Sequence, residues 1–128
     1  AGYRGLPGRS GYSASKYALQ GWLESLRTEL LHKKVHVMWV SPGFTSSNIR
    51  RAALTSDGNA QGESPMNEKE MMSAEECAQR MLDAMEEKKR SLVMTLNDKR
   101  TVLISRLFPG LADKLTYKYF FKNHRLIK

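Results

Sequence analysis

The sequence has little that would support a disulfide, a metal centre or a membrane span. Cys77 is its one cysteine, so an internal disulfide is excluded, and neither it nor the three histidines show a zinc-ligand spacing. No apolar run approaches the roughly 18 to 20 residues that a membrane-spanning helix needs. The start at Ala1 does not resemble a signal peptide. We therefore expect a cytoplasmic protein without a metal site.

The sequence also lacks an even distribution of charge. The net charge is +8, and residues 96–128 contain eight basic residues but only two aspartates. The basic residues are Lys99, Arg100, Arg106, Lys114, Lys118, Lys122, Arg125 and Lys128, and Tyr117, Phe120 and Phe121 lie between the last of them. From Lys114 on, the cations recur at helical spacing, which is compatible with an anionic membrane surface or nucleic acid. A helix that covers a sheet edge and keeps its cations in solvent would show the same pattern.

What the sequence does contain is an alternation of helix and strand patterns. Residues 1–11 hold four glycines and a proline and are predicted to form a loop. An amphipathic helix is predicted over 12–33, because apolar residues recur there at intervals of three and four. These are Leu19, Trp22, Leu23, Leu26 and Leu30. Residues 35–43, VHVMWVSPG, are nearly all apolar before Pro-Gly, as is typical of a strand buried in a parallel sheet.

The second half begins with a long polar segment, residues 44–72. A loop of this length in a compact domain is usually functional or disordered, and its methionines, Met66, Met71 and Met72, suggest an adaptable apolar lid. Ser73 and Glu76 then form a capping-box pattern at the start of a predicted helix over 73–89. Its apolar stripe consists of Cys77, Met81, Leu82 and Met85. A strand is predicted at 91–96.

The remaining pattern, 98–124, is helical and broken at Pro109-Gly110. The order of the elements predicts an α/β fold with a parallel sheet. Two strands cannot bury both faces of such a sheet, so we expect the chain to be part of a larger domain. The expected parts of residues 1–128 are a helix and strand over 1–43, a loop region over 44–72, a helix and strand over 73–96, and a basic helical tail over 97–128.

Tyr12 and Lys16 stand four residues apart at the start of the first predicted helix. Residues at this spacing lie on one face of a helix, so the two side chains can meet. A neighbouring ammonium group and a helix N-terminus both favour the phenolate form of a tyrosine, which suits proton transfer. An exposed helical pair without chemistry has the same spacing, so the two residues alone leave both interpretations open.

The surrounding sequence adds to this pattern. The stretch GYSASKYAL, the following helix, the strand VHVMWV and then SPGFTSSNI resemble the C-terminal half of the short-chain dehydrogenase/reductase family. Tyr-Ser-Ala-Ser-Lys carries the resemblance most specifically, and the likeness covers residues 1 to about 95. It implies the C-terminal part of a Rossmann-like, doubly wound parallel sheet with flanking helices, and an NAD(P)-dependent oxidoreductase of the carbonyl reductase or alcohol dehydrogenase type.

The resemblance also implies roles for individual residues. Tyr12 would be the general acid/base, and Lys16 would assist it and bind the nicotinamide ribose. The turn Pro42-Gly43 would lead into a segment against the nicotinamide, in which the backbone of Thr45 meets the carboxamide. Phe44 and Ser47 belong to the same segment. The sequence departs from the family pattern by having Thr45 where an aliphatic residue is common, and Ser47 where a threonine is usual.

Parts of the family pattern are missing. There is no GxGxxG phosphate loop, and the family's catalytic serine and structural asparagine would precede Ala1. Ser10, Ser13 and Ser15 lie beside the tyrosine and are poor substitutes for that serine. We therefore expect a C-terminal fragment that lacks the dinucleotide-binding βαβ units and is inactive by itself.

Cofactor and partners follow from the same resemblance. NADP(H) is expected before NAD(H), with a small carbonyl or alcohol as the substrate. The chain is expected to form a homo-oligomer or to associate with the missing N-terminal half. Contact of the C-terminal tail with a membrane surface is a further possibility, whereas nucleic acid is not expected. The alternative function is a non-catalytic binding module that uses the basic C-terminal helices.

Overall fold

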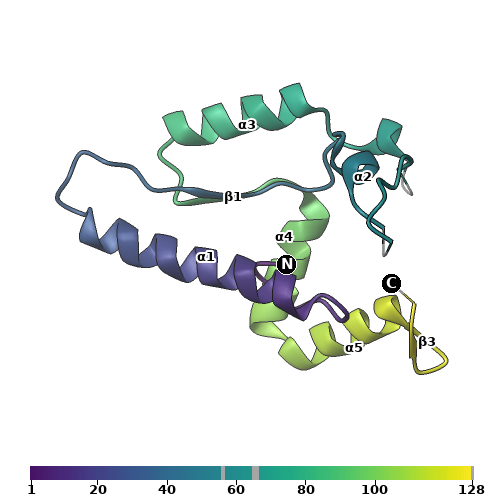
Figure 1. The fold of residues 1–128 in the computed structure, drawn as a ribbon. Helices are drawn as coiled ribbons and strands as arrows, with labels where there is room; N and C mark the ends of the chain where they lie inside the picture. Colours follow the sequence, from purple (N-terminus) through teal and green to yellow (C-terminus); the bar gives the residue numbers. More distant parts are fainter. Residues whose placement is uncertain (56, 65–66, 128) are drawn as a thin grey trace.

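The computed structural model describes residues 1–55, 57–64 and 67–127 (Figure 1). Met66 and Lys128, to which the sequence analysis gave roles, lie outside these residues. The elements are α1 (Ser10–Glu29), β1 (Trp39–Ser41), α2 (Ile49–Ala52), the 3-10 helix η1 (Glu68–Glu70), α3 (Ala74–Glu86), β2 (Ser91–Val93), α4 (Leu96–Leu107), α5 (Pro109–Phe120), β3 (Phe121–Lys122) and β4 (Arg125–Leu126). The predicted order of helix, strand, loop, helix, strand and helices is confirmed.

The centre of the fold is a parallel pair of strands. β1 and β2 pair with Trp39 opposite Ser91 and Ser41 opposite Val93. α3 lies on one side of this sheet and α1 on the other (Figure 1), so both faces have a helix. This is the α/β arrangement predicted from the sequence. In the described residues the parallel sheet has these two strands, and a complete doubly wound sheet is not observed.

The predicted strand over 35–43 is too long. Pairing is limited to Trp39–Ser41, because β2 begins opposite Trp39 and its partner residues end at Val93. Before the strand, the Val37 carbonyl accepts hydrogen bonds from Nε and Nη2 of Arg27 at 3.1 and 3.0 Å instead of joining a ladder. The second predicted strand, 91–96, is also too long. β2 ends at Val93, because Thr95 already caps the helix that follows.

The first helix also differs at its ends. α1 begins at Ser10, two residues earlier than predicted, and ends at Glu29 rather than near residue 33. Turn hydrogen bonds replace the helical ones after Glu29: Leu31 N–H donates to the Thr28 carbonyl, and Lys33 N–H to the Leu30 carbonyl. The glycine-rich loop that precedes α1 contains Gly8 at a φ of 73°, a backbone angle that a glycine adopts without strain.

The cap predicted for the second helix is confirmed. Ser73 Oγ accepts a hydrogen bond from the Glu76 N–H at 3.1 Å at the start of α3. The predicted apolar stripe is only partly covered: Cys77 is buried and Met81 is half-buried, while Leu82 and Met85 are exposed. Ala84, which the stripe did not include, is among the buried residues because α3 turns it toward the sheet side.

The C-terminal region is helical only as far as Phe120. α4 and α5 meet at Phe108, and Pro109 occupies the first turn of α5, where a missing N–H costs nothing. The predicted continuation to residue 124 is wrong, because residues 121–126 form an antiparallel hairpin. Its turn residues, Asn123 and His124, have φ angles of 49° and 60°, which end a helix and suit a tight hairpin turn. Lys122 and Arg125 therefore lie on the hairpin.

Few apolar side chains are fully covered. Those among the described residues are Val37, Cys77, Ala84, Met94, Ala112 and Phe120. Many larger ones are exposed on α1, α4 and α5, including Trp22, Leu103 and Phe108. No helix within the described residues is long and apolar enough to cross a membrane.

Candidate active site

Tyr12 and Lys16 meet on the first two turns of α1. The Lys16 Nζ lies 5.3 Å from the centroid of the Tyr12 ring, so the predicted contact between the two side chains is present. The Tyr12 side chain is 54% exposed, and Lys16 is exposed beside it. α1 begins on the side of the sheet where β1 and β2 end (Figure 1). The pair therefore lies at the carboxyl edge of the parallel strands, where open α/β folds bind ligands.

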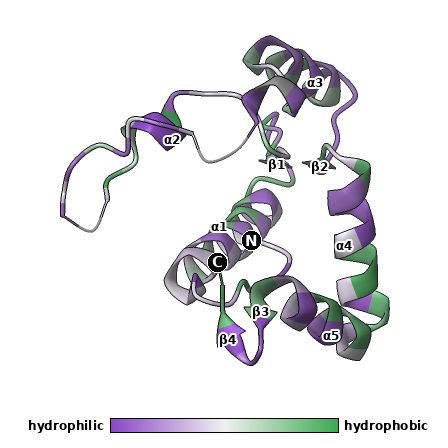
Figure 2. Cartoon of the chain, turned by 90° about the vertical axis from the view of Figure 1, so that its right-hand side faces the viewer, coloured by the Kyte–Doolittle hydropathy of each residue, from purple (hydrophilic) through white to green (hydrophobic). Residues whose placement is uncertain are grey.

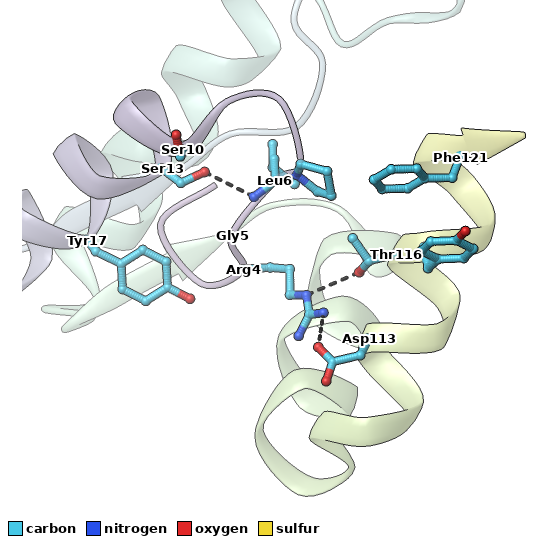
Figure 3. Close-up of a pocket in the computed structure, with 11 residues that line it drawn as sticks. Arg4, Gly5, Leu6, Ser10, Ser13, Tyr17, Asp113, Thr116 and Phe121 are labelled. Carbon is cyan, nitrogen blue, oxygen red and sulfur yellow. Dashed lines mark hydrogen bonds and ion pairs between the residues drawn. The ribbon is translucent and has the colours of Figure 1, made fainter. Parts of the chain in front are cut away.

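A cavity lies on a different face of α1. It has a volume of about 510 Å³ and is lined by Ser13 and Tyr17 of α1, by the loop before it and by α5 (Figure 3). Arg4 crosses it, donating to Thr116 Oγ1 at 3.1 Å and pairing with Asp113 at 2.5 Å. Neither Tyr12 nor Lys16 lines this cavity. The cavity is thus a contact region between the N-terminal loop and α5, separate from the tyrosine-lysine pair.

The serines near Tyr12 have structural partners. Ser13 is buried, and its Oγ accepts a hydrogen bond from the Leu6 N–H at 3.1 Å, which ties the N-terminal loop to α1. Ser15 Oγ donates to the Tyr12 carbonyl at 2.8 Å. Ser10 lines the cavity on the other face of the helix. This agrees with the sequence-based view that none of them replaces the family's catalytic serine.

The two loops that leave the sheet pack against each other. A Cβ added to Gly43 would collide with Thr95 Cγ2 and come within 3.3 Å of Asp98 Oδ2. Thr95 caps α4 by accepting a hydrogen bond from the Asp98 N–H at 3.1 Å. The turn after β1 and the first turn of α4 therefore pack against each other at this edge.

Beyond Gly43 the chain forms a bridge with the end of the long loop. Ser46 N–H donates to the Met72 carbonyl at 2.9 Å, and Met72 N–H donates to the Phe44 carbonyl at 3.2 Å. Thr45 is the bridging residue, so its own N–H and carbonyl point away from Met72. No described residue accepts a hydrogen bond from the Thr45 N–H. Its carbonyl accepts one from Arg50 Nη1 at 3.3 Å.

Glu68 holds this bridge in place. Its carboxylate accepts a hydrogen bond from Ser46 Oγ at 3.1 Å and lies 3.7 Å from Arg50 Nη1. A hydrogen bond from Ser64 lowers the pKa of the Glu68 carboxyl most; the Ser46 hydrogen bond and the positive charge of Arg50 also lower it, and loss of solvent opposes them. The result is a polar clamp of Ser46, Arg50 and Glu68 that fixes the backbone around Thr45.

Comparisons with known proteins identify the family to which this part of the chain is similar. A family model described as short chain dehydrogenase matches residues 1–58, which include α1, β1 and the segment through Thr45. The chain is 37% identical over 111 residues to dehydrogenase/reductase SDR family member 7B of Mus musculus. The chain belongs to the short-chain dehydrogenase/reductase family.

Other members of the short-chain dehydrogenase/reductase family extend the likeness. The Drosophila melanogaster protein called dehydrogenase/reductase SDR family protein 7-like is 32% identical over 107 residues, and the Dictyostelium discoideum protein of that name is 31% identical over 119 residues. These alignments, with that to the mouse protein, cover 83%, 93% and 86% of this chain. The longest reaches beyond the first 95 residues, into the C-terminal helices. No solved structure matches the chain.

The alignments cover a much smaller share of the relatives than of this chain. The chain spans about one third of their length: 34% of the mouse protein, 33% of the Drosophila protein and 36% of the Dictyostelium protein. The family membership therefore rests on this third, and the activity of the whole protein is treated below as a proposal.

The residues that the family pattern assigns to the nicotinamide cofactor fit that group in part. Lys16, Pro42, Phe44 and Ser47 are exposed, and the Thr45 N–H points away from its bridge partner. Gly43 is half-buried because its backbone packs against Thr95. These residues can supply an ammonium group, a backbone donor and an apolar ring to the nicotinamide half of a dinucleotide. In the described residues no group of three or more His, Cys, Asp or Glu is placed to hold a metal ion.

Sequence reasoning did not find the clamp around Thr45 or the contact of Gly43 with Thr95. The Thr95-x-x-Asp98 spacing is a capping signature and could have predicted the start of α4. No comparable signal links Ser46, Arg50 and Glu68, because their association depends on how the long loop folds back to Met72. The predicted lid methionines Met71 and Met72 are half-buried at this return.

Proposed function

We propose that Tyr12 is the general acid/base of an NAD(P)-dependent oxidoreductase and that Lys16 assists it. The observation that carries the proposal is the position of the Lys16 ammonium, 5.3 Å from the Tyr12 ring centroid, on a solvent-accessible face of α1. Exposure of the pair leaves room for a substrate, which a buried structural tyrosine would not.

The chemistry assigns a separate task to each residue. A nicotinamide cofactor supplies the hydride for the substrate carbon when it is bound. Tyr12 gives its hydroxyl proton to the carbonyl oxygen as that oxygen gains charge, which yields an alcohol; in the reverse direction the Tyr12 phenolate removes the alcohol proton. Lys16 would also hold the cofactor by donating hydrogen bonds to the ribose hydroxyls. The Thr45 N–H serves the carboxamide, with Pro42, Gly43, Phe44 and Ser47 around it.

We further propose NADP(H) in preference to NAD(H), and a small carbonyl compound or alcohol as the substrate. Both are carried over from the family resemblance, and the residues that select between the two cofactors precede the tyrosine in this family. Comparing turnover with NADPH and NADH under the same conditions tests the first part. A higher kcat/KM with NADH would overturn it.

The decisive experiment replaces Tyr12 by phenylalanine in the complete protein. Tyr12→Phe keeps the ring and the contact with Lys16 but removes the proton, so turnover should fall by about two to four orders of magnitude. Binding of the reduced cofactor, followed by its fluorescence, should survive. Tyr17→Phe is a matched control, because Tyr17 is an exposed tyrosine on the cavity face of the same helix. Near-normal turnover of Tyr12→Phe would remove the assignment.

Lys16→Met tests the assisting role, with Lys34→Met as a control beyond the end of α1. Because Lys16 acts on both the tyrosine and the ribose, its loss should weaken turnover and cofactor affinity together. A fall in turnover with unchanged cofactor affinity would remove the ribose contact from the proposal. Unchanged values for both would remove Lys16 altogether.

For the chain of 128 residues alone, we propose weak or no binding of nicotinamide dinucleotides and association with itself or with the rest of the protein. The exposed apolar residues Tyr17, Leu19 and Trp22 of α1 support the association. Sedimentation of the isolated chain, with a titration of reduced cofactor, tests both parts. Tight cofactor binding by a monomer would contradict them.

A further inference from the structure

We infer that the corner between α4 and α5 docks on an anionic phospholipid surface. The surface consists of an apolar ridge with cations beside it on both helices, and we call the ridge the apolar corner. Its members are Leu103, Leu107, Phe108, Leu111 and Leu115. This surface lies within the basic tail expected over 97–128, on its two helices and not on the hairpin that follows them. It is also independent of the reaction proposed above.

The apolar corner is continuous along the chain and open to solvent. Leu107, Phe108 and Leu111 are 61%, 60% and 49% exposed, and Pro109 and Gly110 between them are exposed as well. Leu103 lies one helical turn before Leu107, and Leu115 lies one turn after Leu111. Both are also exposed. Five large apolar side chains are thus exposed on α4, on α5 and at Phe108, where the two helices meet.

Cations lie beside the apolar corner on both helices. Lys99 and Arg100 are one turn before Leu103 on α4, while Lys114 and Lys118 follow Leu111 and Leu115 by three residues on α5. All four side chains are exposed. None makes an ion pair with another described residue. Figure 2 shows hydrophobic and hydrophilic segments on both helices where they meet at the corner.

The nearby acids are engaged elsewhere. Asp98 is held at the start of α4 by Thr95, with Oγ1 to Oδ2 at 2.5 Å. Asp113 pairs with Arg4 across the cavity beside α1. The ridge and its surroundings therefore present positive charge with little compensation. Apolar side chains beside cations match the acyl chains and phosphate groups at the boundary of an anionic bilayer.

The dimensions favour a position on the membrane surface. α4 and α5 have 12 residues each, which at the usual rise corresponds to about 18 Å, well below the roughly 30 Å of a hydrocarbon core. Two such helices joined by a bend can insert the ridge to the depth of the headgroups and keep their polar faces in water. A protein partner would need acidic groups around its apolar site, whereas an anionic bilayer offers them everywhere.

The test is sedimentation of the complete protein with vesicles. The wild type should bind vesicles of phosphatidylcholine with phosphatidylserine, bind pure phosphatidylcholine weakly, and dissociate as salt is raised. Lys114→Glu with Lys118→Glu should weaken binding by about 25-fold or more, since each cation near an anionic surface contributes about fivefold. Phe108→Ser with Leu111→Ser should weaken it by about tenfold or more through loss of buried apolar area.

Matched controls lie on other elements. Lys33→Glu with Lys34→Glu changes the same charge beyond α1, and Leu82→Ser with Met85→Ser removes the same kind of exposed apolar pair from α3. Both controls should bind vesicles like the wild type, and circular dichroism should show all variants folded. The inference is overturned if the corner variants bind as the wild type does, or if the controls lose binding equally.

Other occupants of the ridge would give different results. If a second copy covers it, the protein will not bind vesicles, and the corner variants will shift the sedimentation coefficient from dimer to monomer. If another part of the complete protein covers it, there will be no vesicle binding and the same substitutions will lower the unfolding temperature. Either result rejects lipid docking.

Discussion

The β1–β2 sheet and the apolar corner of α4 and α5 hold their side chains in different ways. At the sheet, long side chains bind backbone carbonyls of distant segments: Arg27 binds those of Val37 and Arg90, and Arg80 binds that of Met94. At the corner, the apolar and the basic side chains are both exposed, and the basic ones have no ion pairs among the described residues.

Because of this difference, single substitutions should have different effects in the two regions. At the sheet, each contact joins two particular residues, so a single substitution there should have a large effect on stability. At the corner, affinity for a surface would be a sum over several exposed groups, so a single substitution should leave the fold unchanged. The following predictions compare matched residues of the two regions.

The largest effect is expected from glycines. Gly43→Val should destabilise the protein by about 3 kcal/mol, because the new side chain collides with Thr95 and overpacks the contact of β1 with α4. Gly110→Val, at the corner, should change stability by less than about 0.5 kcal/mol, because nothing lies within 4 Å of the added Cβ. Urea unfolding of the two variants measures the difference. Equal stabilities would show that the edge tolerates a shift at Thr95.

Arginines should give the next effect. Arg27→Ala removes hydrogen bonds to two carbonyls and a guanidinium group 4.4 Å from the Trp39 ring centroid, so the free energy of unfolding should fall by about 2 kcal/mol. Arg100→Ala should change it by less than about 0.5 kcal/mol, since Arg100 is exposed on α4. Thermal unfolding of both variants tests this, and an effect of Arg100→Ala as large as that of Arg27→Ala would contradict the contrast.

The smallest effect concerns pH and the clamp around Thr45. The pKa of Glu68 is lowered from its ordinary value of 4.5, so the folded clamp prefers the carboxylate. Its stabilising contribution is complete above that ordinary value and is lost as the pH falls through the lower, folded pKa. Amide hydrogen exchange of Ser46, corrected for intrinsic rates, should therefore accelerate on acidification. Protonation of Glu68 should not change the exchange of amides at the α4–α5 corner.

Glu68→Gln provides the control for this pH effect. The amide keeps an acceptor for Ser46 but cannot lose or gain the proton, so the acid acceleration at Ser46 should disappear. If the variant retains the same pH dependence as the wild type, another group controls the clamp.

Much of the fold was predictable because it depends on local patterns. The apolar periodicity of α1, the Ser73 cap of α3 and the break at Pro109 each act over a few residues, so their effects can be found in the sequence. The meeting of Tyr12 and Lys16 was predictable for the same reason, since residues four apart share one face of any helix. Cytoplasmic location, cofactor preference and substrate stay predictions.

The tertiary structure decided what depends on distant segments. β1 is three residues long because its partner β2 is, although the apolar run begins before it, at Val35. Residues 121–126 form a hairpin although their spacing suits a helix, since Phe121 pairs with Leu126 around a turn. The clamp of Ser46, Arg50 and Glu68 exists because the long loop returns to Met72. A sequence pattern records the preference of each segment for its own conformation, whereas these features depend on which other segment lies beside it.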